Sequence, residues 1–238
     1  MADNSEKMMF LDTGPVISLM MSGLREVLPE LKQRYRGKFY ITPSVQKELV
    51  ERPLLVKRFE FEALQVQKFI EEGVLEVYSQ VPKKLSSALI NLANNSFQIK
   101  GKSIDVIQSG EIESVACALE TGAEAVAMDE RTLRLFIENP MELKSLLQHR
   151  FRSEVSVNLP NLRNFSQQLK SVKIIRSVEL VGVAYRLGLL DKYIPMKKVD
   201  MGKDGREVLL DAVLWDTKYN GCAVTEEEIE ELKKFLLK

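Results

Sequence analysis

Short apolar runs alternate along this chain with longer segments in which apolar residues recur at helical spacing. The short runs predict strands at residues 8–12, 39–41, 74–78, 125–128 and 172–175. The longer segments predict helices, among them 24–35, 57–72, 83–93, 111–120, 178–187 and 207–219. Because strands and helices take turns, the pattern predicts an α/β fold in which helices flank a central parallel sheet.

The pattern also predicts how the later parts of the chain are organised. Residues 131–171 form a long insertion between two predicted strands, with a helix to Phe136, a helix at 141–149 and an irregular stretch after it, because Pro140 and Pro160 interrupt the spacing. The last helix begins at Thr225, which forms a capping box with Glu228. We therefore expect one domain at 1–193 and a C-terminal helical extension at 194–238 packed on the same core.

Composition adds a local charge bias to this picture. The 238 residues are 45% hydrophobic and carry no net charge, which fits an ordinary globular core and points to no global affinity for nucleic acid or membrane. However, residues 131–176 contain nine Lys or Arg against three acidic residues. This segment is either a solvated basic surface or a contact for nucleic acid, for which Lys144, Arg150, Arg152 and a stacking Phe151 are the candidates.

The cysteines and the apolar stretches bear on where the protein works. Cys117 and Cys222 are the only cysteines, without the spacing of a zinc site or a disulfide framework. No uninterrupted apolar stretch approaches the roughly 18 residues that a membrane span needs. We therefore expect a cytoplasmic protein with no membrane partner.

Four carboxylates stand at strand ends or helix starts: Asp12, Glu48, Glu111 and Asp129. Residues that follow the carboxyl ends of parallel strands face the ligand crevice, so these side chains are expected to converge. Clustered carboxylates repel one another unless a cation compensates, and oxygen ligands favour Mg²⁺ or Mn²⁺. The set predicts a metal site that activates water for phosphodiester hydrolysis, with these four residues as metal ligands and catalytic residues.

The neighbours of these acids leave some choices open. Glu111 and Glu113 lie on opposite sides of one helix, so both cannot point squarely at one ion. Glu111 is the first choice, because it stands at the helix start after Gly110. Glu130, beside Asp129, fits a helix-start residue. The sole histidine, His149, has no Ser and Asp arrangement around it that would indicate covalent catalysis.

Three motifs and their order resemble the PIN-domain proteins, metal-dependent ribonucleases that include many prokaryotic toxins. Residues 10–19 (FLDTGPVISL) look like the opening strand of that family with its first acid, and residues 41–49 (ITPSVQKEL) look like its second-acid helix. Residues 110–118 (GEIESVACA) are similar to its glycine-acid helix, and the strand ending at Asp129 follows at the expected interval. Motifs at 176–179, 188–190 and 219–221 resemble the endings of one prokaryotic branch.

The resemblance implies a PIN-like fold, an endoribonuclease dependent on Mg²⁺ or Mn²⁺, RNA as substrate and an antitoxin-like protein as a candidate partner. The chain departs from the family at Gly14, where many members place a Ser or Asn that helps to hold water at the metal. Thr13 or Ser18 is a candidate substitute. The basic insertion is a second departure, since a minimal member has a short helix and loop there.

Other hypotheses compete with the nuclease. One is a catalytically inactive PIN-like protein that binds RNA or serves as a scaffold. A metal-dependent phosphatase of another α/β fold is a weaker alternative, because no second Asp follows Asp12 closely. The apolar seam of the last helical pair, which carries Trp215, is either core or the contact of a homodimer.

Overall fold

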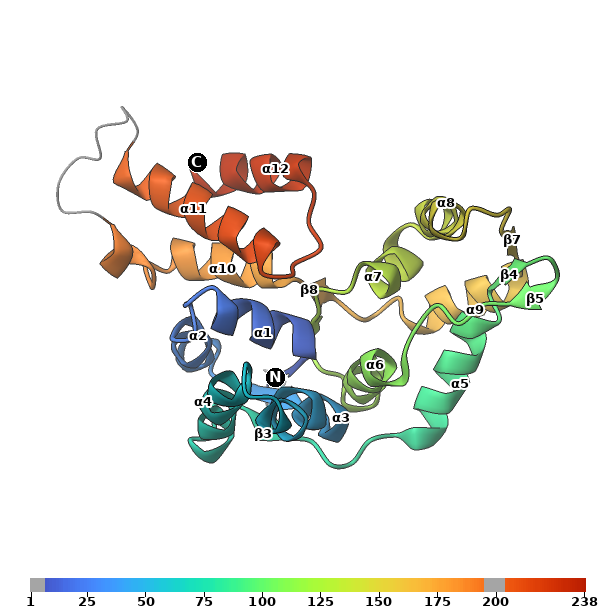
Figure 1. Cartoon of the computed structure of the whole chain (residues 1–238), viewed down its shortest axis with the longest axis horizontal. Helices are drawn as coiled ribbons and strands as arrows, with labels where there is room; N and C mark the ends of the chain where they lie inside the picture. The colour runs from blue at the N-terminus through green and yellow to red at the C-terminus, as the bar shows by residue number, and fades with distance from the viewer. Residues whose placement is uncertain (1–6, 195–203) are drawn as a thin grey trace, which may run out of the picture.

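The computed structural model describes residues 7–194 and 204–238, which form an α/β fold (Figure 1). Within these residues, five strands form a parallel sheet in the order β3-β2-β1-β6-β8. The strands are β1 (Met8–Leu11), β2 (Lys38–Ile41), β3 (Glu76–Val77), β6 (Ala125–Ala127) and β8 (Ile174–Ile175). The predicted fold class, a central parallel sheet flanked by helices with C-terminal helices added, is confirmed.

Both faces of the sheet are covered, which explains why its central strands are continuously apolar in sequence. In β1, Leu11 packs into one hydrophobic cluster and Phe10 into the other. In β6, Ala127 and Val126 divide in the same way. Successive side chains of a strand point to opposite faces, so the two clusters are the cores above and below the sheet.

The first core joins the N-terminal and C-terminal helices, which Figure 1 shows on the same side of the molecule. Its helices come from two parts of the chain that are far apart in sequence. The N-terminal ones are α1 (Thr13–Met21), α2 (Val27–Tyr35), α3 (Pro43–Gln46), the π-helical turn η1 (Lys47–Glu51), the 3₁₀ turn η2 (Pro53–Leu55) and α4 (Glu60–Glu71). The C-terminal ones are α10 (Ser177–Arg186), the 3₁₀ turn η3 (Asp191–Tyr193), α11 (Gly205–Tyr219) and α12 (Glu226–Leu236).

The second core extends from the sheet into a separate lobe, which lies on the right of Figure 1. Three fully buried rings, Phe97, Phe136 and Phe165, pack edge to face or tilted in it, with centroid separations of 5.3 and 4.4 Å. This second lobe contains α5 (Lys83–Asn94), β4 (Phe97–Ile99), β5 (Lys102–Ser103), α6 (Ser109–Thr121), α7 (Arg131–Glu138), α8 (Pro140–Phe151), β7 (Ser156–Val157) and α9 (Leu159–Gln168).

The insertion contains more structure than the sequence pattern predicts. Helices α7 and α8 lie where helices are expected, but the predicted irregular stretch after them is wrong, because α9 occupies it. The Asn158 side chain accepts a hydrogen bond from the backbone N–H of Asn161 at 3.3 Å, and Pro160 lies in the first turn. Proline is tolerated there, since the first helical N–H groups have no partner within the helix, so Pro160 belongs to a helix start.

The C-terminal helices close the first core as a packed pair. The capping box predicted at the start of α12 is confirmed: Glu228 accepts from the Thr225 backbone at 2.8 Å, and Thr225 Oγ1 accepts from the Glu228 backbone at 3.2 Å. Leu210 of α11 and Ile229 of α12 are completely buried. The domain boundary at 193/194 stays a prediction, and residues 195–203 lie outside the described part of the chain.

Two further findings concern the whole of the described chain. Cys117 and Cys222 are buried free thiols. None of the helices in the described ranges has the length and apolar character needed to cross a bilayer.

Candidate functional site

Asp12 follows β1 directly and occupies the position before the first residue of α1. Its backbone N–H donates to the carbonyl of Ala127 at 2.9 Å, which ties the end of β1 to the end of β6. Its side chain makes no capping hydrogen bond to the helix and is only 8% exposed. The carboxylate is therefore buried at the carboxyl edge of the sheet without the capping bond to the second or third helical residue that an aspartate at this position normally makes.

The pKa of Asp12 is raised from 3.8 to about 6. Burial is the largest cause; a hydrogen bond with the Thr13 backbone lowers the pKa, and the negative charges of Glu48, Asp129 and Glu130 raise it further. Three other carboxylates are thus close enough to act on Asp12 electrostatically.

Glu48 reaches the same place from the opposite side. The helix predicted here begins as α3, with the hydroxyl of Thr42 accepting from the Val45 backbone, and continues as the π-helical turn η1 that carries Glu48. Such turns are often found at functional sites. Glu48 Oε2 accepts from the Thr13 hydroxyl at 2.8 Å, and Arg52 lies 3.8 Å from Oε1.

The structure separates the two glutamates of α6. Glu111 lines the pocket and also closes a capping box, since its Oε2 accepts from the Gln108 backbone at 3.2 Å. Its pKa is raised from 4.5 to about 7, mainly by burial and then by the charge of Glu130. Glu113 instead accepts a hydrogen bond from the hydroxyl of Ser44. Glu111 is therefore placed to act with Asp12, and Glu113 belongs to the contact between α6 and α3.

Asp129 has a different environment from Asp12, although both end strands. Its Oδ1 accepts from the Ser177 backbone N–H at 2.7 Å and from the Ser177 hydroxyl at 3.0 Å. Its Oδ2 accepts from the Ser18 hydroxyl at 3.0 Å. Both oxygens of this carboxylate, which is 5% exposed, are occupied by protein donors. Asp129 thus fixes the start of α10 and the middle of α1 against the end of β6.

Glu130 is a site residue for which the sequence pattern predicts only a helix-start role. That role is present, because its Oε2 accepts from the Leu133 backbone at 2.7 Å at the start of α7. The residue also lines the pocket and, among neighbouring charges, acts most strongly on the pKa of Glu111. Its position directly after a strand-end aspartate is the sequence signal that points to this second role.

These side chains line a single open pocket of about 290 Å³. It brings together all four acids predicted from the sequence with residues from the surrounding turns. The lining residues are Asp12, Thr13, Gly14, Glu48, Gln108, Gly110, Glu111, Asp129, Glu130 and Gly221.

Gly14 is explained by close packing in this pocket. A Cβ at this position would lie 3.1 Å from the Cβ of Asp129, so a larger residue would push against the carboxylate. Hydroxyl groups still reach the acids from the same helix: Ser18 donates to Asp129 and Thr13 donates to Glu48. Thr13 and Ser18, the candidate substitutes for a Ser or Asn at position 14, therefore both contact acids of the site.

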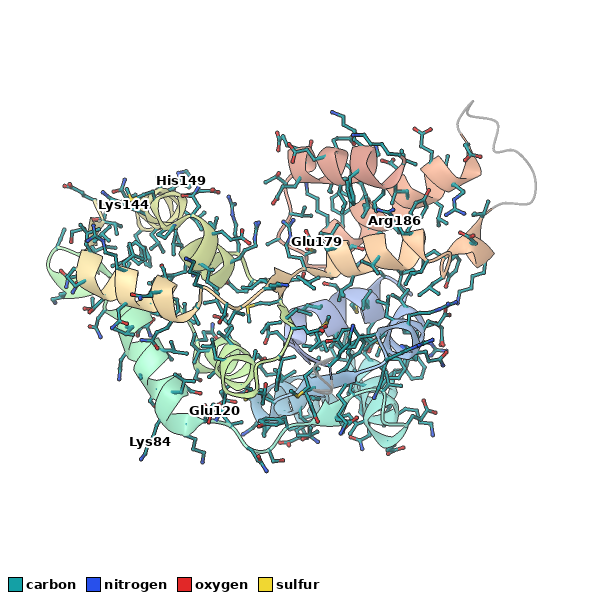
Figure 2. All side chains as sticks on the ribbon, turned by 180° about the vertical axis from the view of Figure 1, so that it is seen from behind. Lys84, Glu120, Lys144, His149, Glu179 and Arg186 are labelled. Atoms are coloured by element: carbon teal, nitrogen blue, oxygen red, sulfur yellow. The ribbon has the colours of Figure 1, made fainter. Side chains whose placement is uncertain are left out.

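The basic segment divides into paired and exposed cations. Arg131, Arg134 and Arg176 form ion pairs with Glu142, Glu228 and Glu179. The other six have no ion pair within the described residues; Lys144 is half-buried and the rest are exposed. These unpaired cations are Lys144, Arg150, Arg152, Arg163, Lys170 and Lys173. Figure 2 shows Lys144 and His149 on α8, at the far side of the second lobe from α10 with its Glu179 and Arg186.

The donor set of the pocket suits a hard divalent cation, because every candidate ligand is a carboxylate oxygen. Within residues 7–194 and 204–238, no three His, Cys, Asp or Glu side chains form a group that could hold a metal ion in their present positions. Three of the four predicted acids accept hydrogen bonds from protein donors: Asp129 from serine groups, Glu111 from the Gln108 backbone and Glu48 from the Thr13 hydroxyl. Comparison of the chain with protein-family models, with curated proteins and with solved structures gave no match.

Proposed function

We propose that this protein is a PIN-type endoribonuclease that depends on Mg²⁺ or Mn²⁺ and hydrolyses RNA phosphodiester bonds. One observation carries the proposal: acids from four separate parts of the chain line one pocket at the carboxyl edge of a parallel sheet. Burial and mutual repulsion raise the pKa values of Asp12 and Glu111, so the pocket as folded carries an electrostatic cost. A divalent cation would remove that cost.

The residues of the chain divide the work in this proposal. Asp12, Glu48 and Glu111 would hold the cation, and Asp129 would serve as a fourth ligand through a carboxylate that Ser18 and Ser177 keep in place. Such an ion activates water and neutralises charge that develops on the phosphoryl oxygens. Thr13 orients Glu48 through the hydrogen bond between them. To bind the cation, Glu111 would give up the hydrogen bond that it accepts from the Gln108 backbone.

The exposed cations of the second lobe support RNA as the substrate. An acidic pocket repels a phosphate backbone, so a nuclease needs basic groups elsewhere on its surface to bind an extended substrate. Arg150, Arg152, Arg163, Lys170 and Lys173 are exposed, and none has an ion pair within the described ranges. Phe151 is 42% exposed beside the Arg150 guanidinium and offers a ring to an unpaired base.

An inactive RNA-binding or scaffold protein of the same fold is the second candidate. It is favoured by Asp129, because a carboxylate whose two oxygens already accept three hydrogen bonds has a complete structural role without any cation. Such a protein would bind RNA and leave it intact.

Metal binding and cleavage, measured on the same samples, test the proposal. Calorimetry with Mn²⁺ is performed on the wild type, Asp12→Asn and Glu111→Gln, with Glu113→Gln as the matched control that lies on the same helix but contacts Ser44. We expect the first two variants to lose Mn²⁺ binding and cleavage of single-stranded RNA, and the control to keep both. A folded wild type that binds RNA, does not bind Mn²⁺ and does not cut RNA would establish the scaffold function instead.

The remaining partners stay predictions with tests of their own. Light scattering after size-exclusion chromatography measures whether the chain forms a homodimer, the alternative to core packing for its last helical pair. A toxin with an antitoxin-like partner predicts growth arrest on overexpression that a neighbouring gene relieves. Fractionation of cells tests the cytoplasmic localisation.

A further inference from the structure

A second cavity, which we call the apolar groove, adjoins the acidic pocket. It has a volume of about 610 Å³ and lies between α1, the η1–α4 segment and the end of α11. Apolar side chains make up most of its lining: Ile17, Met21, Leu49, Phe59, Val66 and Tyr219. Glu48 and Gly221 line both cavities, so one ligand can occupy the pocket and the groove together.

The groove contains a polar group that lacks a partner. Glu62 of α4 lines it, and the Oε2 atom of this carboxylate is buried and accepts no hydrogen bond within the described residues. A buried acceptor left unpaired destabilises the folded chain, and more so when it is charged. Such a group needs an explanation, and a ligand in the groove that supplies the missing donor is one.

The walls of the groove favour a flat, aromatic ligand. Phe59 is 39% exposed and Tyr219 is 76% exposed, although both are large rings. The guanidinium of Arg58 lies 5.3 Å from the Phe59 ring, and Trp215 stacks on Tyr219 at 5.8 Å. Exposed rings backed in this way are stacking surfaces for nucleobases.

We infer that the apolar groove binds an unpaired guanine base of the RNA whose phosphate lies at the acidic pocket, with Glu62 as the residue that selects it. A carboxylate only accepts hydrogen bonds, and guanine is the base that presents two adjacent donors, N1–H and the N2 amino group, on its Watson–Crick edge. Because Oε2 is closed off from solvent in the folded chain, Glu62 would turn its carboxylate into the groove to accept from both donors. The groove admits a base only when that edge is free, so it selects single-stranded RNA. This inference rests on the proposed ribonuclease function.

Nucleoside binding tests the inference apart from catalysis, because nucleosides have no phosphodiester bond and need no metal. Equilibrium dialysis of guanosine, inosine, adenosine and uridine is measured with the full-length, metal-free protein. Guanosine should bind about tenfold more tightly than uridine, and inosine, which lacks the N2 amino group, should lie between them. The fluorescence of Trp215, the single tryptophan, should change on binding because its ring contacts Tyr219.

Two variants and a control assign the effect to the groove. Glu62→Gln should weaken guanosine binding about tenfold and leave uridine unchanged. Phe59→Ala should weaken all four nucleosides alike. Glu71→Gln is the matched control, since Glu71 lies on the same helix and bonds only to Gln67 among the contacts described for it.

The outcomes separate this inference from the proposed function. Equal binding of the four nucleosides, absence of binding, or an unchanged guanosine affinity in Glu62→Gln would overturn the guanine site, even if the protein cuts RNA. Selective guanosine binding by a protein that never cuts RNA would keep the site and reject the nuclease. If both hold, cleavage sites in single-stranded RNA should lie beside guanine in the wild type and lose that preference in Glu62→Gln.

Discussion

Replacement of Asp129 and of Asp12 should change stability in opposite directions, although both residues end strands in the same pocket. Asp129 accepts three hydrogen bonds from Ser18 and Ser177, and both serines are essentially buried. Asp12 is also buried, but it is surrounded by negative charge and has no side-chain cap bond. One acid is therefore held by donors, and the other is repelled by its neighbours.

The magnitudes follow from these contacts. Hydrogen bonds to charged groups contribute roughly 1.5–3 kcal/mol each, and the cost of burying the carboxylate offsets part of their sum. We expect Asp129→Ala to lower the free energy of unfolding by about 3 kcal/mol, and Asp129→Asn, which keeps one acceptor for Ser177, by about 1 kcal/mol. Asp12→Asn removes a repelled charge and should stabilise the metal-free protein by about 1 kcal/mol at pH 8.

Urea denaturation in EDTA at pH 8 measures all three variants without any contribution from metal. For a chain of this size, a loss of 3 kcal/mol also lowers Tm by roughly 6–12 °C. The reasoning is refuted if Asp129→Ala unfolds at the wild-type urea concentration, or if Asp12→Asn loses as much stability as Asp129→Ala. The first result would mean that the serine donors do not stabilise Asp129, and the second that Asp12 is held by its surroundings and not repelled by them.

Three other predictions test separate parts of the structure. The folded protein binds protons more tightly than the unfolded chain, because the pKa of Asp12 is raised from 3.8 to about 6 and that of Glu111 from 4.5 to about 7. Metal-free stability should therefore be highest below pH 4 as far as these groups are concerned, and should fall by roughly 5 kcal/mol as the pH rises to 8. Urea titrations measure this loss, and Mn²⁺ should reverse it. Glu228→Ala should lower the free energy of unfolding by about 3 kcal/mol, since it removes a capping box and one carboxylate partner of Arg134 and Arg176. A loss below about 0.5 kcal/mol in thermal unfolding would mean that these ion pairs do not stabilise the C-terminal helices. Gly182→Leu should destabilise by about 1–3 kcal/mol while leaving Mn²⁺ binding intact, because even a Cβ at this position would lie 3.1 Å from Leu236 Cδ1.

Local sequence patterns predict the strands and the acids well, because each depends on a few consecutive residues. The β1 and β6 runs are apolar on both faces, and a strand buried on both sides has no other composition available. The capping box of Thr225 and Glu228 is likewise complete within four residues. The convergence of Asp12 with Glu48, Glu111 and Asp129 follows from the geometry of a parallel sheet.

Features that depend on contacts between distant residues are not predicted, because no short run of the sequence encodes them. The donors that occupy Asp129 come from Ser18 and Ser177, which are 111 and 48 residues away. Pro160 interrupts the helical spacing, so the sequence pattern predicts an irregular stretch where α9 lies; only the Asn158 cap identifies Pro160 as part of a helix start. The orphan oxygen of Glu62 has no local signal, since an acid on the first turn of an amphipathic helix is ordinarily solvated.

The C-terminal helices belong to the site as well as to the core, which argues against treating residues after 193 as a mere appendage. Gly221, in the turn between α11 and α12, lines both the acidic pocket and the apolar groove. The preceding carbonyl, that of Asn220, accepts from the Ser18 hydroxyl at 3.3 Å, and the same hydroxyl donates to Asp129. Glu228 of α12 pairs at 2.8 Å with Arg176, the residue before Ser177. Because Ser177 holds Asp129, a displacement of either C-terminal helix would reach the acids through two independent contacts.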